Sequence, residues 1–297
     1  MKDITLCCID CVNQPLAIRA LRRSMPALPF AQILLLTNGT YDLPDLQVQY
    51  IPALQSHAEY SHFVAKALVA HVHTSHVLLV QWDGYIVNPS AWTEEFLQYD
   101  YIGAPWGFHR DAYRVGNGGF SLRSKRLLEA LRDPEIAEIH PEDVAICRQY
   151  RPLLEQRYGI RFAPETVAEQ FSFESTIPRN VPFGFHALHN MWVCLKPEEL
   201  HDFLMLLTPD IVASRQCLLL ARNFLEKGRQ AEAVAVLQRR LQVLPGDTQT
   251  LVLLKHATSL SQKYISMLRE KIDTFGRRHP FFPWLTRRQG TRREDEP

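Results

Sequence analysis

A short apolar run that ends in an acidic turn is the feature that most constrains the fold of this chain. Residues 77–80 (VLLV) are uninterrupted aliphatic side chains, and the segment QWDG, residues 81–84, follows directly. Such a run is typical of a strand buried on both faces of an α/β sheet. Because ligands of open α/β sheets bind outside the carboxyl ends of the strands, Asp83 is a candidate functional residue. The alternative is an Asp that only closes the turn.

Strand and helix patterns alternate over the first two-thirds of the chain. This alternation predicts an α/β domain with a largely parallel sheet flanked by helices. Further strands are expected at residues 4–9, 31–37, 48–51 and 159–163. Helices are expected at residues 16–25, 56–73, 91–97 (capped by Ser90), 125–131 (capped by Ser124) and 164–169, with another opening near His140.

The strand patterns stop after about Pro197. Residues 197–207, 211–227, 231–244 and 248–275 all have helical spacing. The small and large residues of 220–245 are spaced as in one tetratricopeptide (TPR)-type hairpin, although repeats of this kind need neighbours to bury their faces. We therefore expect three parts: an α/β domain over 1–197, a TPR-like helical region over 198–276 and a tail over 277–297.

The composition is that of a globular protein without a global charge. The chain has 297 residues, 46% of them hydrophobic, which is enough for a sizeable core. A formal net charge of +1 gives no overall attraction to nucleic acid. No secretory signal and no run of roughly 20 apolar residues is visible, and the six cysteines lack paired zinc-site spacing. A cytoplasmic protein with reduced thiols is expected.

The tail of residues 277–297 mixes arginines with Phe281, Phe282 and Trp284. Basic and aromatic side chains together favour anionic membrane surfaces, so peripheral contact with the inner membrane is one interpretation. A frayed chain terminus is the other.

Two segments in the middle of the chain combine aromatic residues with glycines. The segment that ends at Trp106 (YDYIGAPW) fits an aromatic platform for sugars or bases, or else a packed loop. Asn117, Gly118 and Gly119 form a backbone that a ligand can approach closely. This segment lacks the Gly-Lys-Ser/Thr of a P-loop and the spacing of a dinucleotide fingerprint.

Two later segments carry titratable side chains. Glu142 and Asp143 open a helix, where acids also interact favourably with the helix dipole. His186 stands alone between phenylalanines, in FGFH. A lone His is more often structural than a ligand, so both readings stay open.

Five segments follow one another between Gln81 and His186: QWDGYIVNP, YDYIGAPW, VGNGGFSLRS, HPEDV and FGFH. In this order they resemble a domain-of-unknown-function family regarded as bacterial glycosyltransferases of the GT-A type. The resemblance covers roughly residues 1–195 and leaves the helical end outside. It implies a GT-A (Rossmann-like) fold, a nucleotide-sugar donor, with a UDP-sugar as the first expectation, and a divalent cation, Mn²⁺ or Mg²⁺.

The resemblance also implies roles for individual residues. GT-A enzymes carry a D-x-D signature, and the matching triplet here has Gln81 in place of the first acid. Asp83 takes the metal role of the last acid, and His186 matches a late His that often supplies a second metal ligand. Asp143 resembles the catalytic base of inverting enzymes, with Glu142 in reserve. Donor or acceptor contacts are implied for Gln81, Trp82, Asp83, Gly84, Trp106, Asn117, Gly118 and Gly119.

The expected function is therefore metal-dependent, inverting transfer of a sugar from a nucleotide-sugar to a glycan or a lipid-linked acceptor. No nucleic-acid partner is expected. Because Gln81 replaces an acid, a second hypothesis is a catalytically degenerate GT-A domain that acts as a binding or scaffold module in glycan assembly. A metal-dependent phosphohydrolase built on Asp83 and His186 is less favoured, because no other metal-spaced acids accompany them.

Overall fold

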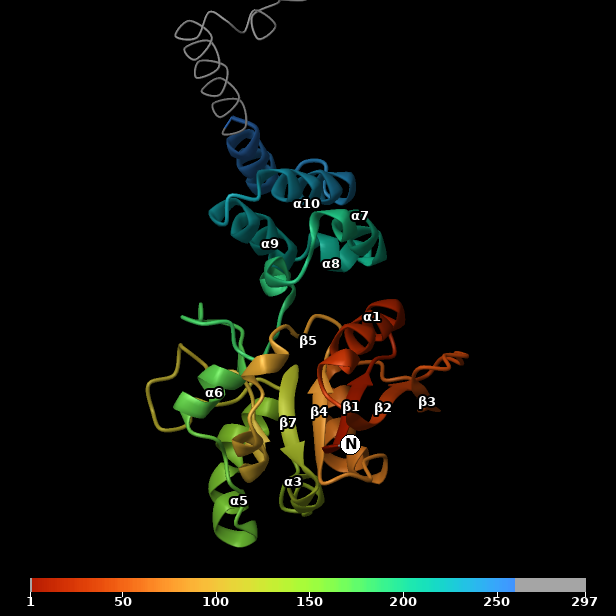
Figure 1. Cartoon of the computed structure of the whole chain (residues 1–297), viewed down its shortest axis with the longest axis vertical. Helices are drawn as coiled ribbons and strands as arrows, with labels where there is room; N and C mark the ends of the chain where they lie inside the picture. Colours follow the sequence, from red (N-terminus) through yellow and green to blue (C-terminus); the bar gives the residue numbers. More distant parts are fainter. Residues whose placement is uncertain (1, 260–297) are drawn as a thin grey trace, which may run out of the picture. The chain divides into compact units, whose positions relative to one another are not determined.

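The structure is a computed structural model that describes residues 2–259. The chain forms two compact units, residues 1–211 and 212–297, which are described separately (Figure 1). Helix α7 (Pro197–Leu206), which the sequence analysis grouped with the helical region, belongs to the first unit. The expectations for residues 260–276 and for the tail at 277–297 lie outside the residues described.

The first unit is built on a six-stranded sheet in the order β3-β2-β1-β4-β7-β6. Neighbouring strands among β1 to β4 run parallel, whereas β7 runs antiparallel to both β4 and β6. The predicted α/β class with a mostly parallel sheet is confirmed. The strands are β1 (Lys2–Ile9), β2 (Phe30–Thr37), β3 (Gln47–Tyr50), β4 (His76–Val80), β6 (Tyr101–Ile102) and β7 (Phe120–Ser124).

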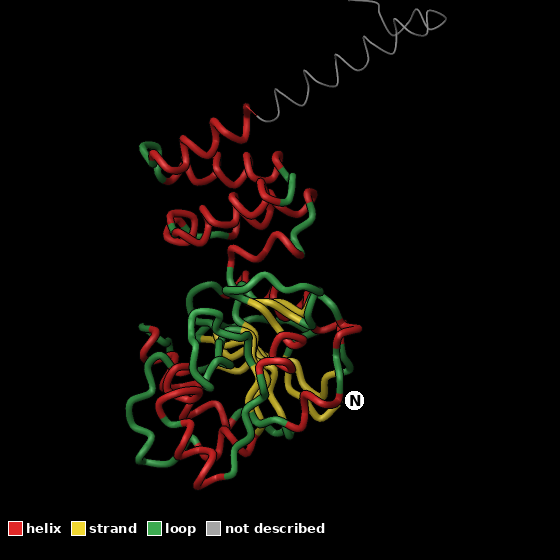
Figure 2. The backbone as a smooth tube through the Cα atoms, turned by 90° about the vertical axis from the view of Figure 1, so that its left-hand side faces the viewer, coloured by secondary structure: helices red, strands yellow, loops and turns green. Residues whose placement is uncertain are grey.

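The central strands are continuous apolar runs because both of their faces are covered (Figure 2). Along β4, Val77 and Leu79 point into one hydrophobic cluster, and Leu78 and Val80 point into the other. Helices α1 (Gln14–Ser24) and α6 (Glu165–Phe171) contribute to the cluster of Leu78. The opposite cluster contains residues of α3 (Lys125–Ala130), of α5 (Arg151–Tyr158) and of the helical segments that precede β4.

The order of the strands creates a switch point beside β1. The chain runs from β1 outward to β2 and β3, and it then returns to place β4 on the other side of β1. Ligands of open α/β sheets bind in the crevice at the carboxyl ends of two such strands. Asp10 follows β1, and Gln81 follows β4, so both lie at this edge.

A second sheet of three short strands lies next to the end of β4. Its order is β5-β9-β8, with β5 (Tyr85–Ile86), β8 (Ser172–Phe173) and β9 (Gly184–Phe185). Tyr85 pairs with Phe185 in the antiparallel β5–β9 ladder, and Phe173 pairs with Phe185 in the parallel β8–β9 ladder. This pairing brings the residues that precede β5 close to those that follow β8 and β9.

The remaining helical segments of the first unit are short, and several depart from α geometry. The predicted helix at 56–73 forms as α2 (His57–His62), the π-helical segment Phe63–Ala67 and the 3-10 turn Leu68–Ala70, with Ser56 as its N-cap. The others are Met25–Ala27, Pro89–Ala91, Glu94–Gln98, α4 (Glu142–Val144), Ala145–Gln149, Leu188–Val193 and α8 (Pro209–Ala213), which spans the boundary between the units.

Two local predictions are wrong, and one strand was missed. Residues 159–163 form only a single bridge, Phe162 with Tyr101, because the partner strand β6 is two residues long. Residues 91–97 form separate 3-10 turns, and Thr93 caps the second turn while Ser90 bonds Asn88 instead. Strand β7 (Phe120–Ser124) was not predicted, and its last residue, Ser124, caps α3 as predicted.

The second unit is helical over its described part. Helices α9 (Arg215–Glu226) and α10 (Gln230–Val243) form a hairpin, and residues 248–259 are also helical. Arg240 ties the three segments together, because its guanidinium donates to the carbonyls of Val212 and Ser214 and to Thr250 Oγ1. In the range 2–259, no helix is both long enough and apolar enough to span a membrane.

Candidate functional site

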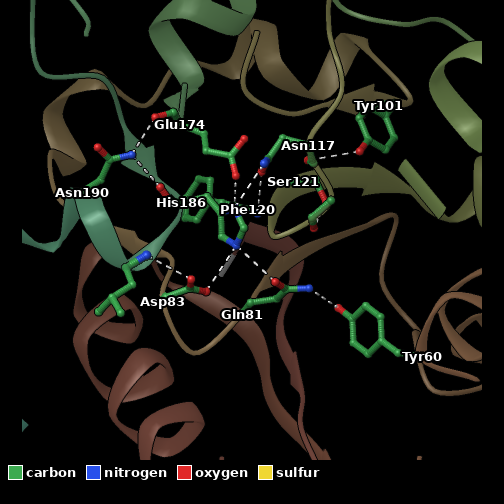
Figure 3. A network of polar contacts seen from close by, with 12 residues as sticks. Tyr60, Gln81, Asp83, Tyr101, Asn117, Phe120, Ser121, Glu174, His186 and Asn190 are labelled. Atoms are coloured by element: carbon green, nitrogen blue, oxygen red, sulfur yellow. Dashed lines mark hydrogen bonds and ion pairs between the residues drawn. The ribbon is translucent and has the colours of Figure 1, made fainter. Parts of the chain in front are cut away.

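His186 is the centre of a polar cluster at the carboxyl end of β4 (Figure 3). Its Nε2 atom lies 3.2 Å from Asp83 Oδ1 and 3.1 Å from Gln81 Oε1. Its Nδ1 atom lies 3.0 Å from Glu174 Oε1 and 3.1 Å from Asn117 Nδ2. We call these five residues the His186 cluster. The structure thus brings together Asp83 and His186, the two residues for which a shared metal ion was expected.

The small sheet explains how residues so distant in sequence meet. The Tyr85–Phe185 pair places the residue that precedes β5 opposite the residue that follows β9, which is His186. Glu174 follows β8 and is adjacent to His186 because the His186 amide donates to the Phe173 carbonyl at 3.0 Å. The second oxygen of Asp83 accepts from the Leu188 amide at 3.1 Å, which fixes the orientation of the carboxylate.

The glycines of the segment 117–119 make room for side chains of the protein itself. A Cβ on Gly119 would overlap the His186 imidazole, and a Cβ on Gly118 would overlap the Glu142 carboxylate. Asn117 has a positive φ of 61°, a conformation that asparagine tolerates better than most residues. This backbone therefore joins the His186 cluster on one side to Glu142 on the other.

The two carboxylates control the charge of His186. Burial by itself would lower the pKa of the imidazole, but Asp83 and Glu174 outweigh burial and raise the pKa to about 10. For Glu174, burial would raise the pKa, and the bond to His186 reverses the effect and lowers it. In the absence of another cation, the cluster is a closely paired imidazolium with two carboxylates.

Within residues 2–259, no group of three or more His, Cys, Asp or Glu side chains is arranged to hold a metal ion. The donors around Nε2 of His186 are one carboxylate and one amide oxygen, at 3.2 and 3.1 Å. Adjacent ligands of an octahedral Mg²⁺ or Mn²⁺ ion, with bonds of about 2.1 Å, are about 3 Å apart. The set therefore fits part of a shell that water or substrate phosphates complete.

Glu174 adds independent support for this fit. A metal-binding His commonly donates its other ring N–H to a carboxylate, which fixes the ring and leaves the remaining nitrogen for the ion. Glu174 has this relation to Nδ1 of His186, and Nε2 then faces Asp83 and Gln81. Asn190 steadies the arrangement, since its Nδ2 donates to the carbonyls of Glu174 and His186, both at 2.8 Å.

A cavity of about 270 Å³ opens at the switch point between β1 and β4. Gln81 belongs both to its lining and to the His186 cluster, and the Gln81 amide donates to the Tyr60 hydroxyl at 3.1 Å. Asp10 accepts from the Val12 amide at 2.7 Å, and burial, with Asp83 adding to it, raises the pKa of Asp10. The lining consists of Ile9, Asp10, Cys11, Val12, Asn13, Leu54, Gln55, Ser56, His57, Tyr60, Gln81 and Trp82.

The two acids of the HPEDV segment differ in their surroundings. Glu142 accepts from Arg123 Nη2 at 3.0 Å, and the Arg123 guanidinium is fully buried against the Tyr101 ring. We call Arg123, Glu142 and Tyr101 the Arg123 cluster. Asp143 is partly exposed, and burial followed by the charge of Glu142 raises its pKa. Asp143 is thus the better placed of the two to exchange a proton.

The other predicted binding residues occupy different environments. Trp82 lines the cavity at the switch point. Gly84 lies in the turn after β4, where a Cβ would be 3.1 Å from the Gly119 carbonyl and 3.2 Å from the Phe185 carbonyl. Trp106 is 4% exposed and packs in the hydrophobic core over Gly116.

Asp10, Tyr60 and Glu174 were not among the site residues predicted from the sequence. Asp10 follows the first buried strand as Asp83 follows β4, so the same rule about strand ends identifies it. Glu174 carries no such signal, because only the β8–β9 pairing places it beside His186.

One family model matches part of the chain. Residues 45–186, just under half of the chain, match the model of a family described as "Protein of unknown function (DUF5672)". The matched span ends at His186 and contains all five members of the His186 cluster. No curated protein matches the chain.

Proposed function

We propose that the chain is a metal-dependent glycosyltransferase of the GT-A type, which moves a sugar from a nucleotide-sugar to a glycan or a lipid-linked acceptor. The observation that carries the proposal is the convergence of Asp83, Gln81 and Glu174 on His186, beside a cavity at the β1–β4 switch point. The sequence resemblance adds the substrate class, and the mostly parallel sheet is compatible with a GT-A fold.

The cavity suits the nucleotide part of the donor. It lies where open α/β sheets bind such ligands, and it combines the rings of Trp82 and Tyr60 with polar groups of Asp10 and Asn13. Gln81 lines the cavity and also contacts His186, so the cavity adjoins the His186 cluster. A nucleotide in the cavity would therefore direct its phosphates toward Asp83.

Asp83 and His186, with Gln81, would hold the divalent cation next to those phosphates. Such a cation neutralises charge on a leaving diphosphate. Glu174 and Asn190 keep the imidazole in position.

Asp143 would accept the proton of the acceptor hydroxyl as general base. A raised pKa brings a carboxylate closer to the basicity that proton transfer near neutral pH requires. Asp143 also accepts a hydrogen bond from the Gly118 backbone, next to the residue that packs on His186. Transfer by direct displacement with such a base inverts the anomeric carbon.

Titration calorimetry of nucleotides and nucleotide-sugars, with and without Mn²⁺, tests the proposal. The wild-type protein should bind at least one nucleotide-sugar, and binding should require Mn²⁺. Asp83→Ala should abolish the Mn²⁺-dependent part, whereas Asp45→Ala, which removes an acid paired with Arg22 at the surface, should not. No Mn²⁺-dependent binding across a panel of nucleotides and sugars would exclude the proposal.

A second candidate is a degenerate GT-A domain that serves as a binding or scaffold module. Two observations favour it: Gln81 stands where a second acid is expected, and the charge of His186 is already balanced by protein carboxylates. In addition, the second unit has an open cavity of about 740 Å³ beside Leu218 and Leu219 of α9. This reading predicts a stable protein partner and neither sugar transfer nor donor hydrolysis.

A further inference from the structure

Two loops of the first unit carry exposed apolar side chains. One loop, residues 107–113, follows Trp106, and the other, residues 174–182, joins β8 to β9 (Figure 1). Phe108 is 66% exposed, and Ile177 is 78% exposed. The loops touch, because a Cβ on Gly107 would lie 2.6 Å from Thr176 Cγ2.

Each loop also carries an arginine two residues after its exposed apolar side chain. Arg110 follows Phe108, Arg179 follows Ile177, and both arginines are exposed. Neither forms an ion pair with any residue in the described range. The acids of the loops are already paired, Asp111 with Arg148 and Glu174 with His186. The surface of the two loops is therefore apolar and cationic.

This surface is continuous with the candidate site. Glu174, the first residue of the second loop, contacts His186 directly. Trp106, which precedes the first loop, packs over Gly116, whose neighbour Asn117 also contacts His186. A molecule bound to the two loops would lie next to the residues proposed for sugar transfer.

We propose that the two loops form a contact surface for an anionic lipid bilayer. Phe108 and Ile177 insert into the interfacial region, and Arg110 and Arg179 pair with lipid phosphates. The proposal is independent of the chemistry at His186. If the proposed function also holds, the contact presents the site to the membrane surface, where a lipid-linked acceptor would lie.

The size and charge of the surface favour a bilayer over a protein partner. A stable protein interface buries about 800 Å² on each partner and needs a well-packed apolar centre. The exposed apolar side chains of the two loops, Phe108, Ile177 and Val181, are too few to provide such a centre, but they can insert individually between lipid headgroups. Unpaired arginines near the apolar tips then gain from the negative surface potential, which a neutral bilayer lacks.

Vesicle sedimentation of the full chain tests the proposal. The wild-type protein should bind phosphatidylcholine vesicles that contain phosphatidylglycerol more strongly than vesicles of phosphatidylcholine alone. The double change Phe108→Ser and Ile177→Ser should weaken binding by on the order of tenfold. Arg110→Gln and Arg179→Gln should each weaken it by about fivefold, and only on the anionic vesicles.

Tyr50 and Met205 provide the matched control. They are 72% and 58% exposed and lie outside both the two loops and the lining of the cavity, so Tyr50→Ser with Met205→Ser should leave binding unchanged. Equal binding by wild-type protein, loop variants and control would overturn the proposal. Loss of vesicle binding without loss of Mn²⁺-dependent nucleotide binding would separate this surface from the site.

Fluorescence quenching provides a second measurement. It detects insertion of the loops themselves and does not depend on any contribution of residues 277–297 to vesicle binding. The extra fluorescence of Phe108→Trp should be quenched by brominated lipid, whereas that of Tyr50→Trp should not. Quenching that is absent in Phe108→Trp, or equal in the two variants, would show that the loops do not enter the bilayer.

Discussion

The two buried charge clusters on either side of Gly118 and Gly119 are built from similar residue types and differ in charge balance. In the His186 cluster, one imidazole is shared by two carboxylates, and the His186 and Asp83 side chains are each 14% exposed. In the Arg123 cluster, one guanidinium meets one carboxylate, and Arg123 is fully buried. The His186 cluster has a net negative charge and is partly exposed to solvent. In the Arg123 cluster the two charges cancel, and the guanidinium is shielded from solvent.

This difference in charge and exposure favours the His186 cluster as a binding site and the Arg123 cluster as a structural support. A buried ion pair contributes little net stability, but removing one partner leaves the other charge uncompensated. The Arg123 cluster is held in this way: its carboxylate already accepts from Arg123, and the guanidinium is fully buried, away from a charged ligand in solvent. The His186 cluster has one more carboxylate than cationic side chains, so a cation from solvent would replace the proton on Nε2 of His186 and take over the pairing with Asp83, while Glu174 keeps its contact with Nδ1.

The largest effect is expected from a substitution in the Arg123 cluster, which should destabilise the fold. Glu142→Gln leaves the buried Arg123 without its carboxylate, and we expect the free energy of unfolding to fall by about 3–5 kcal/mol. Urea denaturation measures the change. Glu155→Gln is the control, because Glu155 pairs with Arg151 at the surface in an i,i+4 pair and should cost less than about 1 kcal/mol. Equal losses in the two variants would refute the distinction.

The next effect concerns the general base that borders the Arg123 cluster. Asp143→Asn should leave donor binding intact and lower kcat by at least about a hundredfold, whereas Glu138→Gln, an exposed acid on the same segment, should have no effect. Steady-state rates with a donor identified by calorimetry measure it. Wild-type turnover in Asp143→Asn would remove Asp143 from the mechanism.

The pH profile sharpens this assignment. A base works when it is deprotonated, so the rate should fall as the pH drops through the pKa of Asp143, which lies above its usual value of 3.8. Burial is the main cause and the charge of Glu142 the second. Glu142→Gln should therefore move the acid limb to lower pH, and Asp143→Asn should remove it. If neither variant shifts the acid limb of the pH–rate profile, that limb reports the titration of a group other than Asp143.

A smaller effect is expected from Glu174, which acts through His186 as a positioning residue. Glu174→Gln keeps the shape but weakens the bond to Nδ1, and it should lower Mn²⁺ affinity by roughly 10- to 100-fold. Calorimetric titration of Mn²⁺ measures this. Glu165→Gln, an acid paired with Arg114 in the same unit, should bind Mn²⁺ like the wild-type protein. Unchanged affinity in Glu174→Gln would contradict the positioning role.

Local sequence patterns could predict the residues that directly follow a long buried strand. The aliphatic run of β4 predicted the strand and placed an acid at its carboxyl end, and the fold class followed from the alternation of such runs. The meeting of Asp83 with His186 was expected from family resemblance. Its physical cause is the β5–β9 pairing, which joins strands of only two residues that no periodicity reveals.

The same limit explains the failures. No strand was predicted at Phe120–Ser124, yet these residues form a buried strand because β4 and β6 pair with it on both sides. Residues 159–163 have strand character but only one bridge partner, so they remain irregular. Gly118 and Gly119 also make room for Glu142 and His186, which their local sequence does not reveal. In each of these segments the conformation depends on contacts with residues distant in sequence, and local sequence patterns do not reveal such contacts.

The smallest expected effect returns to Gln81, where the His186 cluster departs most from the D-x-D pattern. Gln81 bonds His186 through Oε1 and Tyr60 through Nε2, so Gln81→Glu replaces a neutral ligand by a charged one of equal size. A second carboxylate next to the cation should tighten Mn²⁺ binding several-fold, because affinity for hard cations rises with ligand charge. Gln55→Glu, which adds the same charge elsewhere in the cavity lining, is the control. If both variants bind Mn²⁺ equally, the gain is only a long-range charge effect, and Gln81 is not a ligand of the ion.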